Sequence, residues 1–153
     1  MRNIDVSLLE DRLGYRFRDR KLLENALTHK TFAFEASSAV EYNERLEFLG
    51  DSILNFVVAE QLYLSNRYFS EGELTRRRSN GVNNQFLAEV ADHLNLGAFL
   101  RLGKGETKQH GSKNRTNLAN ALEAVIGAIY LDSGLDQVRR FILEKVFSKE
   151  HQF

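Results

Sequence analysis

Three carboxylates recur at helical spacing inside an otherwise apolar stretch of the chain. Glu44, Glu47 and Asp51 lie in YNERLEFLGDSIL, residues 42–54. At about 100° per residue, their side chains fall within about 60° of one another on a helix. Glu47 and Asp51 are four residues apart, about 6 Å along the axis, so both can converge on one point.

A second apolar segment carries a weaker version of the same pattern. In LANALEA, Asn120 and Glu123 are three residues apart. If the two helices pack side by side, four oxygen-bearing side chains meet between them. Buried carboxylates need basic partners or a metal ion. Oxygen ligands without Cys or a nearby His favour Mg²⁺ or Mn²⁺ over zinc, and Mg²⁺ held in this way is a common tool for cleaving phosphate esters.

The spacing alone leaves a second interpretation open. Acidic residues on helices are most often solvated, so the stripe is equally compatible with a surface face. The only basic residue within the stretch, Arg45, points about 100° away from Glu44. A di-iron bundle would need Glu-x-x-His pairs, which the sequence lacks.

The surrounding sequence predicts the helices that must position these residues. The chain has no Pro and long stretches without Gly, which favours a mainly helical protein. Apolar periodicity predicts helices over residues 5–13, 19–28, 43–64, from 70 onward, 83–94, 117–132 and 135–148. The intervening residues 33–42 and 104–115 are predicted to be loops.

Local signals mark several helix ends. Gly14 predicts a C-terminal stop, Asn43 an N-cap, and Ser70 with Glu73 a capping box. The segments 43–64 and 117–132 are apolar nearly all round, which predicts two buried central helices. Residues 1–153 are therefore expected to form one all-α domain.

Composition limits the class of protein. Of 153 residues, 42% are hydrophobic and 27% charged, as in soluble globular domains. The absence of Cys excludes disulfides, thiolate metal sites and a cysteine nucleophile, and suits a reducing cytoplasm. No apolar run of about 18 residues and no signal peptide are present, so we expect a cytoplasmic protein without a membrane partner.

The charge is balanced overall but unevenly distributed. The net charge is zero, which argues against a polybasic coat for nucleic acid. Residues 35–60 hold six acidic residues against Arg45, whereas residues 101–115 hold five basic residues against Glu106. An acidic centre beside a basic loop indicates one site for a cation and one for an anion.

The segment NERLEFLGDSIL resembles the signature of the ribonuclease III family of double-stranded-RNA endonucleases. The segments LLENALTHKTF, SEGELTRRR, LRLGKGE and LANALEAVIGAIYLDSG resemble further blocks of that family in the same order. The resemblance covers roughly residues 5–148 and is strongest to the bacterial type.

The resemblance implies an all-helical endonuclease domain that acts as a symmetric homodimer in RNA processing, including processing of ribosomal RNA. Two Mg²⁺-dependent centres, in which Mn²⁺ can substitute, would flank a valley for double-stranded RNA. Each centre would cut one strand and leave a 5′ phosphate and a two-nucleotide 3′ overhang. Phe48 and Leu49 are expected either at the dimer contact or in the core.

The resemblance also assigns roles to individual residues. Glu47, Asp51 and Glu123 match the catalytic, metal-binding carboxylates, and Asn120 stands at a fourth metal-binding position. Glu44 matches an acid beside the centre. Glu71 matches a supporting acid near the valley, although an acid in the first turn of a helix also suits the helix dipole.

Basic residues are the candidates for RNA contact. Lys104, Lys108, Lys113 and Arg115 are expected to contact phosphate or sugar, and His110 is expected to be a loop residue. Arg76, Arg77 and Arg78 either touch RNA or form a solvated face; Arg76 and Arg78 are carried forward as RNA-binding candidates. A-form RNA is read mainly by shape, 2′-hydroxyls and phosphates, so little base specificity is expected.

Two features depart from the family pattern. Asn120 stands where the family has Asp, which removes one charge and should weaken metal binding. The substitution is natural, engineered, or tolerated in this branch, so a catalytically impaired or inactive RNA-binding member is the alternative function, and an RNA-independent helical module is a remote third. The double-stranded-RNA-binding domain of common bacterial members is absent from residues 1–153, whether cut off or never present, so RNA affinity should be weaker and more salt-sensitive.

Overall fold

The computed structural model describes residues 5–147, and most of that range is helical. Its helices are α1 (Val6–Leu13), α2 (Arg20–Ala26), α3 (Lys30–Glu35), α4 (Glu44–Ser65), α5 (Glu71–Val82), α6 (Asn84–His93), α7 (Lys104–Lys108), α8 (Arg115–Ser133) and α9 (Leu135–Phe141). Short 3₁₀ or π turns cover Leu96–Phe99, Gly111–Lys113 and Ile142–Val146. Residues 5–147 contain no strand beyond an isolated bridge, which confirms the all-α prediction.

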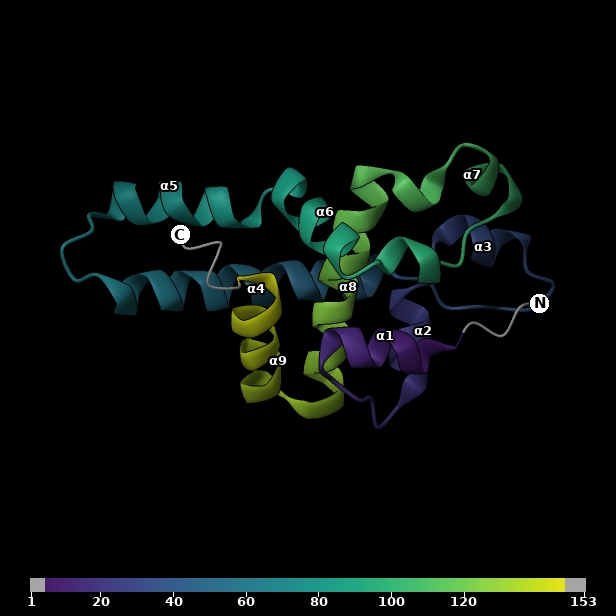
Figure 1. Cartoon of the computed structure of the whole chain (residues 1–153), viewed down its shortest axis with the longest axis horizontal. Helices are drawn as coiled ribbons and strands as arrows, with labels where there is room; N and C mark the ends of the chain where they lie inside the picture. Colours follow the sequence, from purple (N-terminus) through teal and green to yellow (C-terminus); the bar gives the residue numbers. More distant parts are fainter. Residues whose placement is uncertain (1–4, 148–153) are drawn as a thin grey trace.

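Helices α4 and α8 form the most extensive helix–helix contact of the molecule. Helix α8 runs across the N-terminal part of α4 (Figure 1). The crossing is close because each helix presents a glycine to the other. A Cβ atom on Gly50 would overlap the carbonyl oxygen of Glu123, and one on Gly127 would overlap that of Leu46. The two helices that carry the oxygen-bearing side chains are thus in direct backbone contact at this crossing.

The two long helices differ in burial. Helix α8 is the central helix, with every residue from Ala121 to Ile129 buried. Helix α4 buries only one side, through Ile53, Leu54 and Val57 among others. The prediction that α4 would also be buried all round is wrong. The reason is that its apolar residues lie on two opposite faces and the domain covers only one of them.

The uncovered face of α4 is apolar and aromatic. Phe48, Phe56 and Tyr63 are 78%, 50% and 72% exposed. Their positions lie within about 80° around the helix, roughly opposite the buried side. Of the two alternatives for Phe48, burial in the core is therefore excluded, whereas Leu49 is half-buried and packs against the core.

Two segments predicted as loops contain helix. Residues 33–42 overlap the end of α3, and residues 104–115 contain α7 and the turn Gly111–Lys113. Side chains fix the second segment. Glu35 accepts hydrogen bonds from the Lys104 N–H at 3.0 Å, and Glu106 accepts one from Asn117 Nδ2 at 2.8 Å. The polar, Gly-containing composition of this segment predicted a loop. The residues that stabilise its helical turns lie on α3 and α8, so the local sequence did not reveal them.

The helix-end signals are mostly correct. Gly14 ends α1 in the left-handed conformation, at φ 65°. Ser70 caps α5 by accepting the Glu73 N–H at 3.2 Å, while the Glu73 carboxylate pairs with Arg76 and Arg77. Asn43 precedes α4 as predicted, but its side chain makes no capping bond. Its backbone N–H instead donates to the carbonyl of Thr28 at 2.9 Å.

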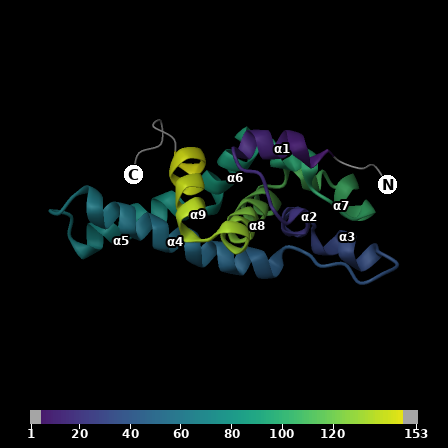
Figure 2. The same cartoon turned by 90° about the horizontal axis from the view of Figure 1, so that it is seen from below.

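Helices α4 and α5 lie side by side as a hairpin that extends from the rest of the molecule (Figure 2). Helices α3 and α7 lie at the opposite end (Figure 1). This arrangement separates the turn between α4 and α5 from the basic segment around α7.

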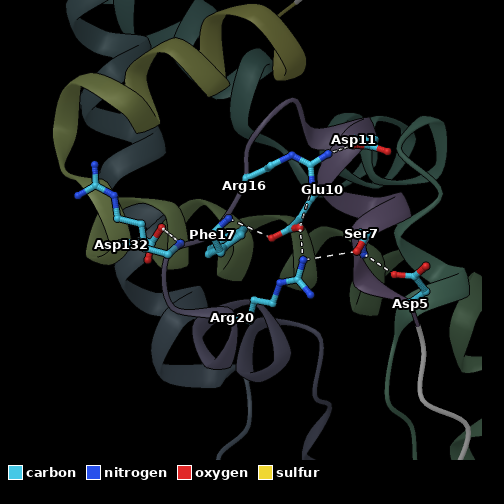
Figure 3. Close-up of polar contacts among 9 residues, drawn as sticks. Asp5, Ser7, Glu10, Asp11, Arg16, Phe17, Arg20 and Asp132 are labelled. Carbon is cyan, nitrogen blue, oxygen red and sulfur yellow. Dashed lines mark hydrogen bonds and ion pairs between the residues drawn. The ribbon is translucent and has the colours of Figure 1, made fainter.

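A buried carboxylate fixes the connection between α1 and α2. Glu10 is 1% exposed and accepts hydrogen bonds from the Phe17 N–H at 3.0 Å and from Arg20 at 3.1 Å (Figure 3). Asp132, at the end of α8, accepts the N–H groups of Arg18 and Asp19 at 2.9 Å. These contacts satisfy the backbone of the turn and tie it to α8.

No helix within residues 5–147 is long and apolar enough to cross a membrane.

Candidate active site

A pocket of about 510 Å³ opens where α4, α6 and α8 meet. Its lining is mainly acidic and consists of Glu44, Glu47, Phe48, Asp51, Asn84, Asn120 and Glu123. The structure therefore brings together all four predicted metal-binding positions and the neighbouring Glu44. Helical spacing on α4, with the glycine-mediated approach of α8, is the physical cause.

Glu123 is the buried member of the pocket, with 7% of its surface exposed. Burial, the negative charges of Asp51 and Glu47, and a hydrogen bond with Asp51 raise the pKa of Glu123 to about 8. In the metal-free protein its carboxyl therefore holds a proton at neutral pH, because burial and the neighbouring carboxylates disfavour its charged form.

Glu47 is half-buried and faces Asn120 across the two helices. In the amide orientation that pairs donors with acceptors, Asn120 Nδ2 donates to Glu47 Oε1 and to the Thr116 carbonyl, both at 3.3 Å. Burial and the charges of Glu44 and Asp51 raise the pKa of Glu47. Asn120 thus supplies a hydrogen-bond donor at a place where Asp would supply another charge.

The outer carboxylates are exposed and have their own partners. Asp51 accepts a hydrogen bond from Asn55 Nδ2 at 3.2 Å. Glu44 pairs with Lys30 Nζ at 3.2 Å, and the charge of Lys30 partly offsets the rise in the pKa of Glu47. Sequence reasoning missed Lys30, because it lies on α3, fourteen residues before Glu44.

The donor set suits a hard cation. Its charged and polar ligands are all oxygens, and the raised pKa values of Glu47 and Glu123 reflect uncompensated negative charge. In residues 5–147, however, no three His, Asp or Glu side chains are gathered tightly enough to hold an ion between them. Mg²⁺ is commonly held by one or two carboxylates plus water and substrate, so the residues fit such an ion without forming a closed cage.

The predicted basic contacts lie on the segment that leads into the pocket. Lys104, Lys108, Lys113 and Arg115 are all exposed. Arg115 begins α8, five residues and about 7.5 Å along the axis before Asn120. His110 adopts a left-handed conformation, at φ 58°, in the turn after α7, in agreement with its assignment as a loop residue.

Like the basic segment, three further predicted residues do not line the pocket. Glu71 begins α5 at the far end of the hairpin, where an acid suits the helix dipole. Arg76 is exposed and pairs with Glu73 at 2.8 Å, whereas Arg78 is half-buried. Their predicted roles near RNA remain predictions.

Asn84 lines the pocket without having been singled out in the sequence. It is the first residue of α6, directly after the N-cap residue Asn83. No motif marks it, since the fold alone brings the start of α6 to α4 and α8.

The sequence and the fold match one family. The Ribonuclease-III-like family model matches residues 19–150. The chain belongs to the ribonuclease III family. It is 51% identical over 135 residues to the Ribonuclease 3 of Alkalilimnicola ehrlichii, covering 88% of this chain and 57% of that protein. It is 47% identical to the Ribonuclease 3 of Bordetella avium, covering 91% and 53%.

Solved structures of the ribonuclease III family share the fold. The nuclease domain of the Campylobacter jejuni enzyme matches with a TM-score of 0.88 and 39% identity, covering 100% of this chain and 99% of that chain. A second structure of that domain, described for flexibility in a region involved in dimer formation, matches with a TM-score of 0.87, 39% identity and coverage of 93% and 96%. The chain spans slightly more than half the length of its curated relatives, whereas it matches the solved nuclease domain over nearly its whole length.

Proposed function

We propose that this chain is the Mg²⁺-dependent nuclease domain of an enzyme that cleaves double-stranded RNA. The observation that carries the proposal is the single pocket in which Glu47, Asp51, Asn120 and Glu123 meet, in a chain of the ribonuclease III family. Products with a 5′ phosphate and a two-nucleotide 3′ overhang, a role in RNA processing and a cytoplasmic location belong to the same proposal.

The candidate ligands for the metal are Glu47, Asp51, Glu123 and the amide oxygen of Asn120. One or two of these carboxylates with water and substrate would suffice for Mg²⁺, and Mn²⁺ could replace it. When bound, it would polarise a phosphate and supply an activated water. The protein's own contribution is charge and position. With an ion bound, Glu123 would lose its proton, and Asn120 would present its amide oxygen instead of donating to Glu47.

The exposed residues of the basic segment support the RNA-binding part of the proposal. The segment consists of α7, a short 3₁₀ turn and the first residue of α8, which carry Lys104, Lys108, Lys113 and Arg115. It comes directly before the part of α8 that lines the pocket. Such contacts to phosphates depend on salt and not on base sequence. Arg76, Arg78 and Glu71 would take part only where RNA or a second copy extends along the hairpin.

We also propose that the domain acts as a homodimer through the exposed face of α4. Phe48, Phe56 and Tyr63 are exposed on one side of α4, and apolar side chains gathered on one exposed face are typical of protein interaction sites. Phe48 also lines the pocket, so a second copy on this face would lie beside the carboxylates.

Cleavage of a labelled RNA duplex tests the proposal. We expect cutting in Mg²⁺, none in EDTA, and little on single-stranded RNA of the same sequence. Asp51→Asn should abolish cutting, whereas Asp92→Asn, the same change on an exposed residue of α6, should leave it intact. Equal rates with and without Mg²⁺, or an active Asp51→Asn variant, would contradict the proposal.

A second candidate function rests on Asn120. Its amide donates to Glu47 and brings no charge to attract a metal, as expected for an impaired member that binds duplex RNA without cutting it. Duplex binding by the wild-type chain with no cleavage in Mg²⁺ would favour this alternative.

A further inference from the structure

The pocket has almost no hydrogen-bond donors. Phe48 is apolar, and ionised carboxylates only accept. Apart from a protonated carboxyl, the side-chain donors among the pocket-lining residues are the amides of Asn84 and Asn120. An RNA backbone presents phosphate and ribose oxygens, which accept hydrogen bonds. A side-chain donor in this pocket could therefore bind the RNA where the carboxylates cannot.

The two amides differ in availability. Asn120 Nδ2 is directed at Glu47 and Thr116. The Asn84 side chain is exposed and makes no hydrogen bond to any other residue in the range 5–147. Its neighbour Asn83 performs the capping of α6 by accepting the Phe86 N–H at 2.9 Å, so Asn84 is not needed for that purpose.

The backbone that carries Asn84 is well fixed. Asn83 also donates to the Asn80 carbonyl at 2.9 Å, which joins α5 to α6, and α6 packs closely on α8. Asn84 therefore lines the pocket from a fixed helix start and is not carried by a loose loop. A fixed polar group at a pocket wall is suited to positioning a substrate.

We propose that Asn84 donates a hydrogen bond to an oxygen of the RNA backbone and so positions the strand at the carboxylates. The inference rests on the proposed function, since it assigns Asn84 a role in binding the same substrate. A phosphate oxygen and a ribose 2′-hydroxyl are both acceptors that the amide could reach, and the experiment separates them.

The competing role for Asn84 is that of a metal ligand through its amide oxygen. The variant Asn84→Asp separates the two roles by sign. A carboxylate keeps the shape, removes the donor and adds a charge, so it should weaken RNA binding if Asn84 is a donor. It should improve metal binding and cleavage at low Mg²⁺ if Asn84 is a ligand. An acid at this position also suits the N-terminus of α6, so the variant should fold.

The experiment measures kcat/KM for duplex cleavage over a range of Mg²⁺ concentrations. We expect Asn84→Asp to lower kcat/KM at least about tenfold and Asn84→Ala about threefold to tenfold, at every Mg²⁺ concentration. Gln85→Glu is the matched control: it makes the same change of charge one residue further along α6, outside the pocket lining. It should stay within about twofold of the wild type.

Replacing single 2′-hydroxyls of the cut strand by hydrogen identifies the acceptor. If the penalty of Asn84→Ala disappears on one such substrate, the contact is that hydroxyl; if it persists on all, the contact is a phosphate. Wild-type rates for both Asn84 variants, or faster cleavage by Asn84→Asp at low Mg²⁺, would overturn the inference while the proposed function stands. A wild-type chain that neither cuts nor binds the duplex would overturn both.

Discussion

At the scale of single residues, the pocket is built to hold more negative charge than the metal-free protein tolerates. Glu123 is protonated near neutral pH because burial and two neighbouring carboxylates raise its pKa. Asn120 relieves part of the same excess by donating to Glu47. Function and stability therefore make opposite demands on these two positions.

The variant Asn120→Asp tests this opposition. A fourth carboxylate should improve metal binding and raise the cleavage rate in Mg²⁺ about tenfold or more. In EDTA the same change should lower the melting temperature, because it replaces a donor beside Glu47 with a like charge. Parallel cleavage assays and thermal unfolding check both effects. Unchanged cleavage would mean that Asn120 does not limit catalysis.

The pH dependence of stability tests the environment of Glu123. Its folded pKa, about 8, lies above the ordinary value of 4.5, so the folded state binds the proton more tightly than the unfolded state. The metal-free protein should therefore lose stability as pH rises from about 4.5 to 8, by at most about 5 kcal/mol.

Glu123→Gln should remove that loss because the amide remains neutral. In EDTA at pH 8 it should melt higher than the wild type, and the difference should vanish near pH 4.5. Glu89→Gln, an exposed change on α6, is the control and should follow the wild-type curve. Parallel curves for the wild type and Glu123→Gln would contradict the assigned burial.

At the scale of elements, the site depends on how closely α4 approaches α8. Successive turns of α4 and α8 supply the oxygen-bearing side chains. The glycines at the crossing let the two backbones approach closely enough for these side chains to share one pocket. The helix α7 and the turn that follows it are positioned by Glu35 and Glu106. Residues 104–115, which the sequence predicted to be a loop, therefore hold their basic side chains on an ordered backbone.

Gly50→Ala should damage this crossing. The new methyl group would collide with the carbonyl of Glu123, a backbone atom of a buried helix that cannot move aside cheaply. We expect a loss of about 3 kcal/mol or more in the free energy of unfolding. Gly72→Ala is the control, because its nearest contact would be Ser70 Oγ at 3.9 Å. This helix-favouring change should be neutral or stabilise by about 0.5–1 kcal/mol. Equal stability of the two variants would show that the crossing tolerates a Cβ.

At the scale of the whole molecule, the acidic pocket and the aromatic face of α4 adjoin each other through Phe48. This face is the reason that α4 appeared to be an all-round buried helix in the sequence. A second copy is the proposed cover, and it would place two pockets in one assembly.

Phe56→Glu should prevent dimer formation without touching the pocket, since Phe56 is half exposed and is not among the lining residues. Sedimentation at micromolar concentration should give a dimer for the wild type and a monomer for the variant. Leu8→Glu, at an exposed position on α1, is the control and should remain dimeric. A wild-type monomer would remove the dimer from the proposed function.

The sequence by itself determined the helical class, most helix boundaries and the carboxylate stripe, because these follow from local periodicity and residue type. It also predicted that Asn120 and Glu123 would meet Glu47 and Asp51, since only one other apolar helix carried matching oxygens. All these features could be predicted from local sequence and the assumption that the two apolar helices pack together.

Only the tertiary structure decided the remaining features. Burial of Glu123 and exposure of Phe48 depend on which faces other helices cover, and hydrophobicity along one helix does not reveal this. Lys30 and Asn84 reach the site from α3 and α6, whose positions are set by contacts far apart in sequence. The carboxylate stripe of Glu44, Glu47 and Asp51 therefore lies at the edge of the hydrophobic core, between the buried side of α4 and the open pocket.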